Sequence, residues 1–385
     1  MMSIPKVFFF TAIDEGQADN AYFQDLIINV ATGMQELGIK YYASNDYWQM
    51  SVDGGFLLES DPHVIHHDCD IVAIERQWYE KHGCLPPDLF APNRQYKTVY
   101  LDCEDGIAGI RSASWQPEFR QFDYILRPHY TTHTQYPDNV YPWAFGLSAR
   151  VIQELAEPIS FADKQASVLV NFRHKKFTHS LRRYIQKHFV PQLGECFRVD
   201  TSADDPTVVE PDPYHYLQWV QTGRRHYPNY YHRLKNSAAC ACFGGFFLAP
   251  NLADAQDSTA YYSAKLIDKL GIKTNRIGQW DSWRLWESMT AGCVTLHVDF
   301  EQYGFELPVM PENWKHYVGI DLDNLESAIA IMREQPELLA QIAVAGRSWA
   351  IEHYAPKPTA LRFLATVSDF STADLKQLSS EVTVK

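Results

Sequence analysis

The sequence predicts an α/β protein made of two domains, each built around a parallel sheet. Its 385 residues exceed what one hydrophobic core usually organises. Short apolar runs alternate with amphipathic segments along both halves, as strands and helices do in parallel sheets. Hydrophobic residues make up 46% of the chain and aromatic residues 14%, so both cores can be filled.

The first half opens with a strand, a helix and a second strand, which we expect at residues 6–11, 21–37 and 39–43. Gly38 ends the helix. The intervening loop, residues 12–20, contains Asp14 and Glu15 and follows the carboxyl end of the first strand. Open α/β sheets bind ligands at that edge. The loop has no GxGxxG pattern, so no dinucleotide site is predicted.

Three further strands are expected at residues 70–74, 98–101 and 124–126. Each is followed by a polar cluster, at residues 75–76, 102–106 and 127–130. Clusters at this edge of a sheet are where an acceptor molecule and a general base would lie. The alternative is that these acidic, glycine-containing segments are ordinary turns.

The second half opens with a strand at residues 167–172 and a helix that runs to about Phe189. Between them lies the main concentration of positive charge in an acidic chain, including Arg173, Lys176, Arg182 and Arg183. Loop amides, a helix amino end and these side chains together predict an anion site. The alternative is a solvated basic helix face.

The rest of this half continues the same alternation. A strand is expected at residues 238–243, followed by the pair Gly244 and Gly245, which allows close backbone approach. Residues 214–231 are dense in aromatic side chains, which form either a stacking surface or a hydrophobic cover. Helices are expected at residues 260–270, 322–335, 336–353 and 356–370.

A short helix and a strand at residues 293–298 form the most informative unit. Asp281 or Ser282 can cap the helix, and Gly292 can end it in the left-handed conformation. Arg284, Glu287, Ser288 and Ala291 share one face. Glu287 is then an acid in an otherwise apolar helix, and its alternative role is a surface ion pair with Arg284.

The pattern Arg284-Leu285-Trp286-Glu287 followed by Ala291-Gly292-Cys293-Val294 resembles the nucleotide-binding segment of GT-B glycosyltransferases, most closely the exostosin-like and CgeB-like groups. The resemblance implies two Rossmann-like domains facing across a cleft. It also implies that Glu287 accepts hydrogen bonds from the donor ribose, while arginines neutralise the diphosphate. Many retaining members carry a second Glu where this chain has Gln279. The implied donor-binding residues are Arg173, Lys176, Gly245, Arg276, Gln279, Arg284, Glu287 and Ser288.

The resemblance also divides the chain. It implies an acceptor domain at residues 1–155, a linker at 156–166, a donor domain at 167–355, a crossover helix at 356–372 that packs on the first domain, and a polar tail at 373–385. Residues 141–147 resemble the segment that closes the first domain in this family.

The expected reaction moves a sugar from a nucleoside diphosphate donor to a hydroxyl acceptor, which can be a glycan, a lipid or a small molecule. The family needs no metal or cofactor. An inverting reaction needs a base in the first domain, and the candidates, in falling order, are Asp105, Asp14, Glu15, Asp102 and His129. The alternatives are a nucleotide-sugar epimerase or hydrolase, and a binding protein without activity, which Gln279 mildly favours. A DNA-modifying glucosyltransferase of the same fold is a further alternative, which the net charge of −13 disfavours.

Composition and net charge limit the classes of partner that the protein is expected to bind. The net charge of −13 argues against a broad nucleic-acid or anionic-membrane footprint. No apolar run is long enough to span a bilayer, and no secretory signal is recognised. Cys240 and Cys242 share a strand face but lack further metal ligands nearby. The seven cysteines contain no CxxC pair, which favours reduced thiols and a cytoplasmic setting.

Overall fold

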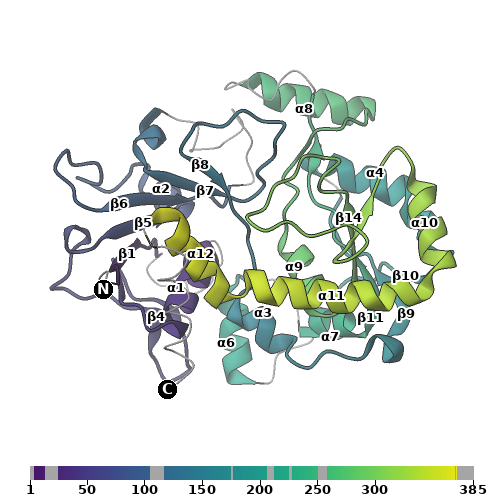
Figure 1. Ribbon diagram of the computed structural model, residues 1–385, viewed down its shortest axis with the longest axis horizontal. Coiled ribbons are helices and arrows are strands. Elements are labelled where there is room, and N and C mark those ends of the chain that lie inside the picture. The colour runs from purple at the N-terminus through teal and green to yellow at the C-terminus, as the bar shows by residue number, and fades with distance from the viewer. Residues whose placement is uncertain are drawn as a thin grey trace.

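Two parallel sheets form the centres of two domains, seen at the left and right of Figure 1. The computed structural model describes residues 4–13, 25–104, 117–174, 177–205, 212–224, 228–249, 258–368 and 370. All seven cysteines lie in this part of the chain, and none of them forms a disulfide. Within the described ranges, every helix is too short or too polar to cross a membrane.

The first sheet has six strands in the order β2-β1-β5-β6-β7-β8, and all its pairs are parallel. Its central strands are runs of apolar residues that are buried on both faces, as expected for a parallel sheet covered by helices. The strands are β1 (Val7–Phe10), β2 (Tyr41–Ala43), β5 (Ile71–Glu75), β6 (Lys97–Leu101), β7 (Tyr124–Arg127) and β8 (Val140–Pro142).

The second sheet has five strands in the order β10-β9-β11-β14-β15, again all parallel. They are β9 (Gln165–Leu169), β10 (Arg198–Asp200), β11 (Ser237–Ala241), β14 (Val294–Val298) and β15 (Val318–Ile320). Helices of this domain include α4 (Ser180–His188), α5 (Val190–Leu193), α7 (Pro228–Asn236), α8 (Ser258–Leu270), α9 (Trp283–Thr290) and α10 (Leu325–Glu334).

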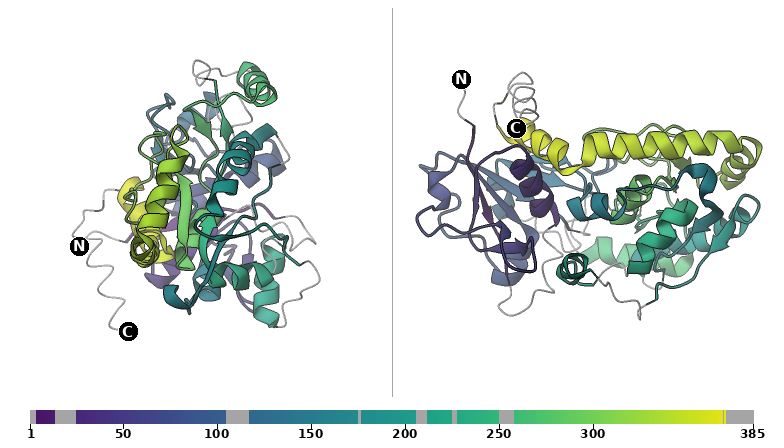
Figure 2. Two further views of the ribbon diagram at one scale, coloured as in Figure 1. Left: turned by 90° about the vertical axis from the view of Figure 1, so that its right-hand side faces the viewer. Right: turned by 90° about the horizontal axis from the view of Figure 1, so that it is seen from below.

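The last helices carry the chain back to the first domain. Figure 2 shows α11 (Pro336–Tyr354) running along the second domain and α12 (Pro356–Val367) continuing onto the first. Phe363 and Leu364 are buried in the core that also contains residues of β1 and of α1 (Asp25–Glu36). A Cβ on Gly33 would lie 2.0 Å from the Pro356 carbonyl oxygen, so α1 and α12 pack this closely only because residue 33 is glycine. The predicted crossover helix is confirmed.

Several short elements differ from the sequence prediction. The hairpin β3 (Tyr47–Gln49) and β4 (Phe56–Leu58), and the edge strands β8, β10 and β15, were not expected. Each has three residues, too few to show a period. The helix predicted at residues 322–335 begins at Leu325, because the Asn324 side chain accepts a hydrogen bond from the Ser327 amide and caps it. The remaining elements are α2 (Arg76–His82), α3 (Ala149–Glu154), α6 (Pro213–Gln221), β12 (Phe246–Phe247) and β13 (Ile277–Gly278).

Backbone and side-chain hydrogen bonds join the two domains. The Trp280 indole donates to the Tyr130 carbonyl at 3.0 Å, and the Asp281 amide donates to Nδ1 of His129 at 3.0 Å. The Thr132 amide donates to the Gly304 carbonyl at 2.8 Å. The loop after β7 is therefore bonded to the loops before α9 and after β14.

Candidate functional site between the domains

Helix α9 forms as the sequence predicts, with one difference at its start. Ser282 is the N-cap residue, but its side chain makes no capping hydrogen bond. The Asp281 carboxylate instead accepts bonds from the Trp286 indole at 2.9 Å and from the Phe145 amide at 3.0 Å. Gly292 has a φ of 67°, so the predicted left-handed end of the helix is confirmed.

Glu287 on α9 is a buried acid, with 2% of its surface exposed. Its Oε2 accepts a hydrogen bond from the Tyr230 hydroxyl at 2.8 Å, and its Oε1 accepts one from Tyr231 at 3.4 Å. Burial raises the pKa of Glu287, and the Tyr230 hydrogen bond and the charge of Arg284 oppose that rise. Neutral phenols therefore hold this carboxylate in place.

The alternative of a surface ion pair between Arg284 and Glu287 is wrong. Glu287 is not at the surface, and Nε of Arg284 donates to Oδ1 of Asn171 at 2.9 Å. Asn171 follows β9, so this bond connects α9 to the basic segment that the sequence singles out.

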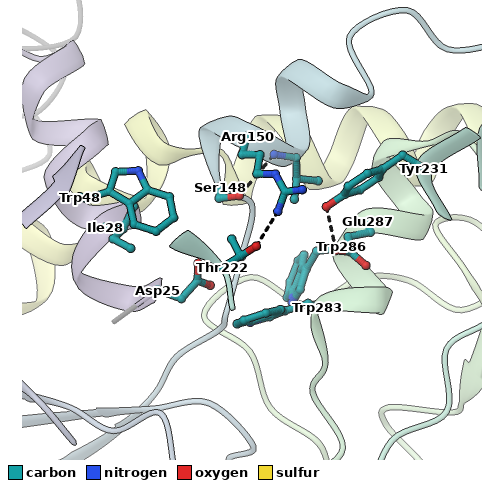
Figure 3. A pocket seen from close by; sticks show the side chains of 12 residues that line it. Asp25, Ile28, Trp48, Ser148, Arg150, Thr222, Tyr231, Trp283, Trp286 and Glu287 are labelled. Carbon is teal, nitrogen blue, oxygen red and sulfur yellow. Dashed lines mark hydrogen bonds between the residues drawn. The ribbon is translucent and has the colours of Figure 1, made fainter. Parts of the chain in front are cut away.

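Glu287 lines a cleft between the domains, whose empty volume is about 500 Å³ when the adjoining solvent is included. Figure 3 shows its walls. Side chains of α1 and β3 come from the first domain, and side chains near α7 and α9 come from the second. Residues around α3 connect them. The lining residues are Asp25, Ile28, Trp48, Gly146, Ser148, Arg150, Val151, Thr222, Tyr231, Trp283, Trp286 and Glu287.

Arg150 is the buried cation of this cleft. Its Nη1 donates to the Thr222 hydroxyl at 2.9 Å, and its guanidinium lies 5.6 Å from the centre of the Tyr231 ring. Its charge also lowers the pKa of Glu287. Figure 3 shows Arg150 beside Tyr231 and Thr222. The cleft thus carries a positive and a negative group on neighbouring walls.

Trp48 closes the first-domain side of the cleft in an unusual backbone conformation. Its φ is 62°, a left-handed value that costs a bulky residue energy. The next residue is fixed from the second domain, because the Gln221 side chain accepts from the Gln49 amide at 2.7 Å and donates to its carbonyl at 2.9 Å. The β3–β4 hairpin is thereby tied to α6.

Sequence reasoning missed most of the cleft residues. Asp25, Trp48, Arg150 and Trp283 come from four elements, and no motif connects them. The one available signal was the aromatic density before β11, which contains both tyrosines that hold Glu287, but it did not single out Tyr230 and Tyr231 as its partners.

The predicted bases fall into two groups. Asp14, Glu15 and Asp105 lie outside the described residues. Asp102 and His129 are described, and neither lines the cleft. Asp102 is fully buried in an ion pair with Arg127, and Nδ1 of His129 accepts from the Asp281 amide. Both side chains are thus engaged in contacts that stabilise the fold.

Among the predicted donor-binding residues, Glu287 lines the cleft and Arg284 lies one turn before it. Lys176 lies outside the described residues, and Arg173 is exposed at the loop after β9. Ser288 is fully buried with its hydroxyl 2.8 Å from that of Thr295, behind the cleft wall.

The donor-binding role of Gly245 stays a prediction, and the structure shows that the neighbour that requires a glycine here is backbone. A Cβ there would lie 2.0 Å from the Gly278 carbonyl oxygen and 2.9 Å from that of Gln279. The φ of Gly245 is 84° and that of Gln279 is 56°. Arg276 donates to the His133 carbonyl in the first domain. At this corner, the backbone at Gly245 packs directly against the backbone of residues 278–279.

No family profile matches the sequence, and no curated protein matches it. Solved structures do match. An alpha-glucosyltransferase in complex with UDP aligns with 94% of this chain and 99% of its own, with a TM-score of 0.51 and 8% identity. An alpha-glucosyltransferase with UDP-glucose and DNA containing an abasic site aligns over the same shares, with a TM-score of 0.50 and 9% identity.

These alignments show the fold. The chain has the GT-B arrangement of two Rossmann-like domains facing across a cleft, as the sequence predicts. The narrower resemblance to exostosin-like and CgeB-like groups stays a prediction.

Proposed function

We propose that this protein is a glycosyltransferase that moves a sugar from a nucleoside diphosphate donor to a hydroxyl acceptor in the interdomain cleft. The observation that supports this proposal most strongly is the buried carboxylate of Glu287 on the cleft wall. An ionised carboxylate is a pure hydrogen-bond acceptor. The vicinal hydroxyls of a ribose match that acceptor.

The diphosphate needs positive charge close to Glu287. We propose that Arg284, Arg173 and Lys176 supply it, because Arg284 is bonded to Asn171 at the end of β9, where the basic segment begins. Side chains can then neutralise the leaving group without a divalent metal. Transfer is expected to continue in EDTA, and its loss on chelation would contradict this part of the proposal.

The acceptor is proposed to meet the first-domain wall of the cleft. Asp25 is a carboxylate on that wall, and we add it to Asp105, Asp14 and Glu15 as a proposed base. Asp102 is left out because Arg127 neutralises it. Substitution of the true base by its amide is expected to lower kcat and leave donor affinity unchanged.

A nucleotide panel tests the proposal. Both aligned structures contain UDP or UDP-glucose, so UDP is the first nucleotide to try, followed by GDP, dTDP and their sugars. A ligand at about 100 times its Kd stabilises the fold by about 2.7 kcal/mol, which a thermal melt detects. Failure of every nucleotide to raise the melting temperature would contradict the proposal.

Product analysis separates the alternatives once a donor is known. Sugar transferred to an added acceptor supports a transferase. Epimerised or hydrolysed donor in the presence of acceptors indicates the rival enzyme, and binding without turnover indicates a binding protein. We propose that the acceptor is not nucleic acid, because a net charge of −13 argues against the broad basic footprint that contacts to many phosphates require.

A further inference from the structure

The outer face of α8 is an exposed apolar stripe. Tyr262, Leu266 and Leu270 recur every fourth residue and therefore share one side of the helix. Their exposed fractions are 64%, 56% and 60%, and Ile272 just past the helix is 45% exposed. Single apolar residues are ordinary on a surface, but a row of large ones usually marks an interaction site.

The fold does not need this stripe for its own core. Ala264 and Ile267 on the opposite side of α8 are buried, and Ala264 packs in a small cluster with Phe246 and Leu248. Figure 1 and the left view of Figure 2 both show α8 at the periphery of the second domain. The stripe therefore faces outward on an element that is already anchored.

Positive charge borders the stripe. Lys265 and Lys269 are both exposed, and successive helical residues are about 100° apart, so the two lysines form a row beside Tyr262. Asp268 is the one acid in the α8 sequence, and it pairs with Arg183. Lys269 forms no ion pair with any residue that the structure describes. This local charge is opposite in sign to the chain as a whole.

We propose that α8 docks the protein on the surface of an anionic lipid bilayer. The stripe enters the boundary between headgroups and acyl chains, and Lys269 contacts anionic headgroups while the helix lies parallel to the membrane. In a symmetric contact between two α8 helices the stripes would match, but Lys269 would meet no unpaired acid of α8, because Asp268 is paired with Arg183. The proposal is independent of the donor site.

Vesicle sedimentation of the full chain tests this docking. Wild-type protein is expected to bind vesicles of phosphatidylcholine with about 30% phosphatidylglycerol, and to bind pure phosphatidylcholine more weakly. The double variant Leu266→Gln/Leu270→Gln is expected to lose at least about tenfold in partition coefficient, because two leucines no longer enter the bilayer. Lys269→Ala is expected to weaken binding to anionic vesicles only.

Val344→Gln on α11 is the matched control, since Val344 is 64% exposed and lies on another helix. It is expected to bind vesicles like the wild type, and thermal melts check that all variants fold. Absence of wild-type binding to anionic vesicles would overturn the proposal. So would equal losses in Val344→Gln and the double variant. Light scattering that shows a dimer dissolved by Leu266→Gln/Leu270→Gln, without vesicle binding, would assign the stripe to self-association instead.

Discussion

Among the buried carboxylates, Asp102 in the first domain and Glu287 in the second are held in different ways. Asp102 in the first domain is 0% exposed and forms an ion pair with Arg127, whose side chain is 1% exposed. Glu287 in the second domain is 2% exposed and is held by the neutral hydroxyls of Tyr230 and Tyr231. The first acid is neutralised within the fold, whereas the second lies on a cleft wall.

The difference predicts opposite responses to the same chemical change. A carboxylate paired with a buried cation is needed for stability, because its loss strands that cation in an apolar environment. A buried carboxylate held by neutral hydroxyls contributes less to stability, and such an acid on a cleft wall is a candidate for contact with a ligand. Carboxylate-to-amide substitutions at the two sites separate stability from binding.

The largest effect is expected for Asp102→Asn. This variant is predicted to lose about 3–5 kcal/mol of unfolding free energy, because the buried Arg127 guanidinium loses the carboxylate to which it is bonded. Urea denaturation at neutral pH measures the change. The double variant Asp102→Leu/Arg127→Met is expected to recover most of the loss. A loss below about 1 kcal/mol in the single variant would mean that the pair is not what holds Asp102 in place.

A smaller effect is expected for Tyr230→Phe. The substitution removes the 2.8 Å hydrogen bond to Glu287 and is predicted to cost about 0.5–1.5 kcal/mol of stability. It should also weaken nucleotide binding, because the carboxylate loses the donor that fixes its orientation. Tyr231→Phe, which removes the longer 3.4 Å bond, is the control and should have the smaller effect on stability. Equal effects of the two would contradict the assignment of Tyr230 as the main support.

The smallest effect is a pH dependence. Burial raises the pKa of Glu287 above its ordinary value of 4.5, so ionisation of this side chain disfavours the folded state. The Glu287→Gln variant should therefore match the wild type below about pH 4.5 and gain relative stability as the pH rises through the folded-state pKa. Denaturation of both proteins between pH 4 and pH 8 measures the difference in their unfolding free energies. The contributions of the other buried acids are the same in both proteins and cancel from this difference. A Glu287→Gln variant that becomes less stable relative to wild type as the pH rises would contradict this sign.

The sequence predicts the long elements well, because β1 and the first four residues of β5 are apolar and α9 is followed by a glycine with a left-handed φ. It also singles out Glu287, since an acid on an apolar helix is conspicuous. Helical spacing shows which residues share a face, but not which faces meet. The position of Arg150 and Trp48 in the cleft therefore cannot be predicted from helical spacing, because it depends on how the two domains pack together.

Close packing explains another difference. The glycine pair before β12 suggests room for a ligand, whereas the structure fills that room with the backbone of residues 278–280. A glycine shows that something approaches the chain closely, and the sequence does not reveal what it is.

Calorimetric titration of UDP, or of the nucleotide that the panel selects, into wild-type and Glu287→Gln protein tests the central claim most directly. The account predicts that the wild type binds and that the variant loses about 1.5–3 kcal/mol of binding free energy while its melting temperature is kept or raised. Unchanged affinity in a folded Glu287→Gln variant would show that the buried acid on the cleft wall does not hold the donor.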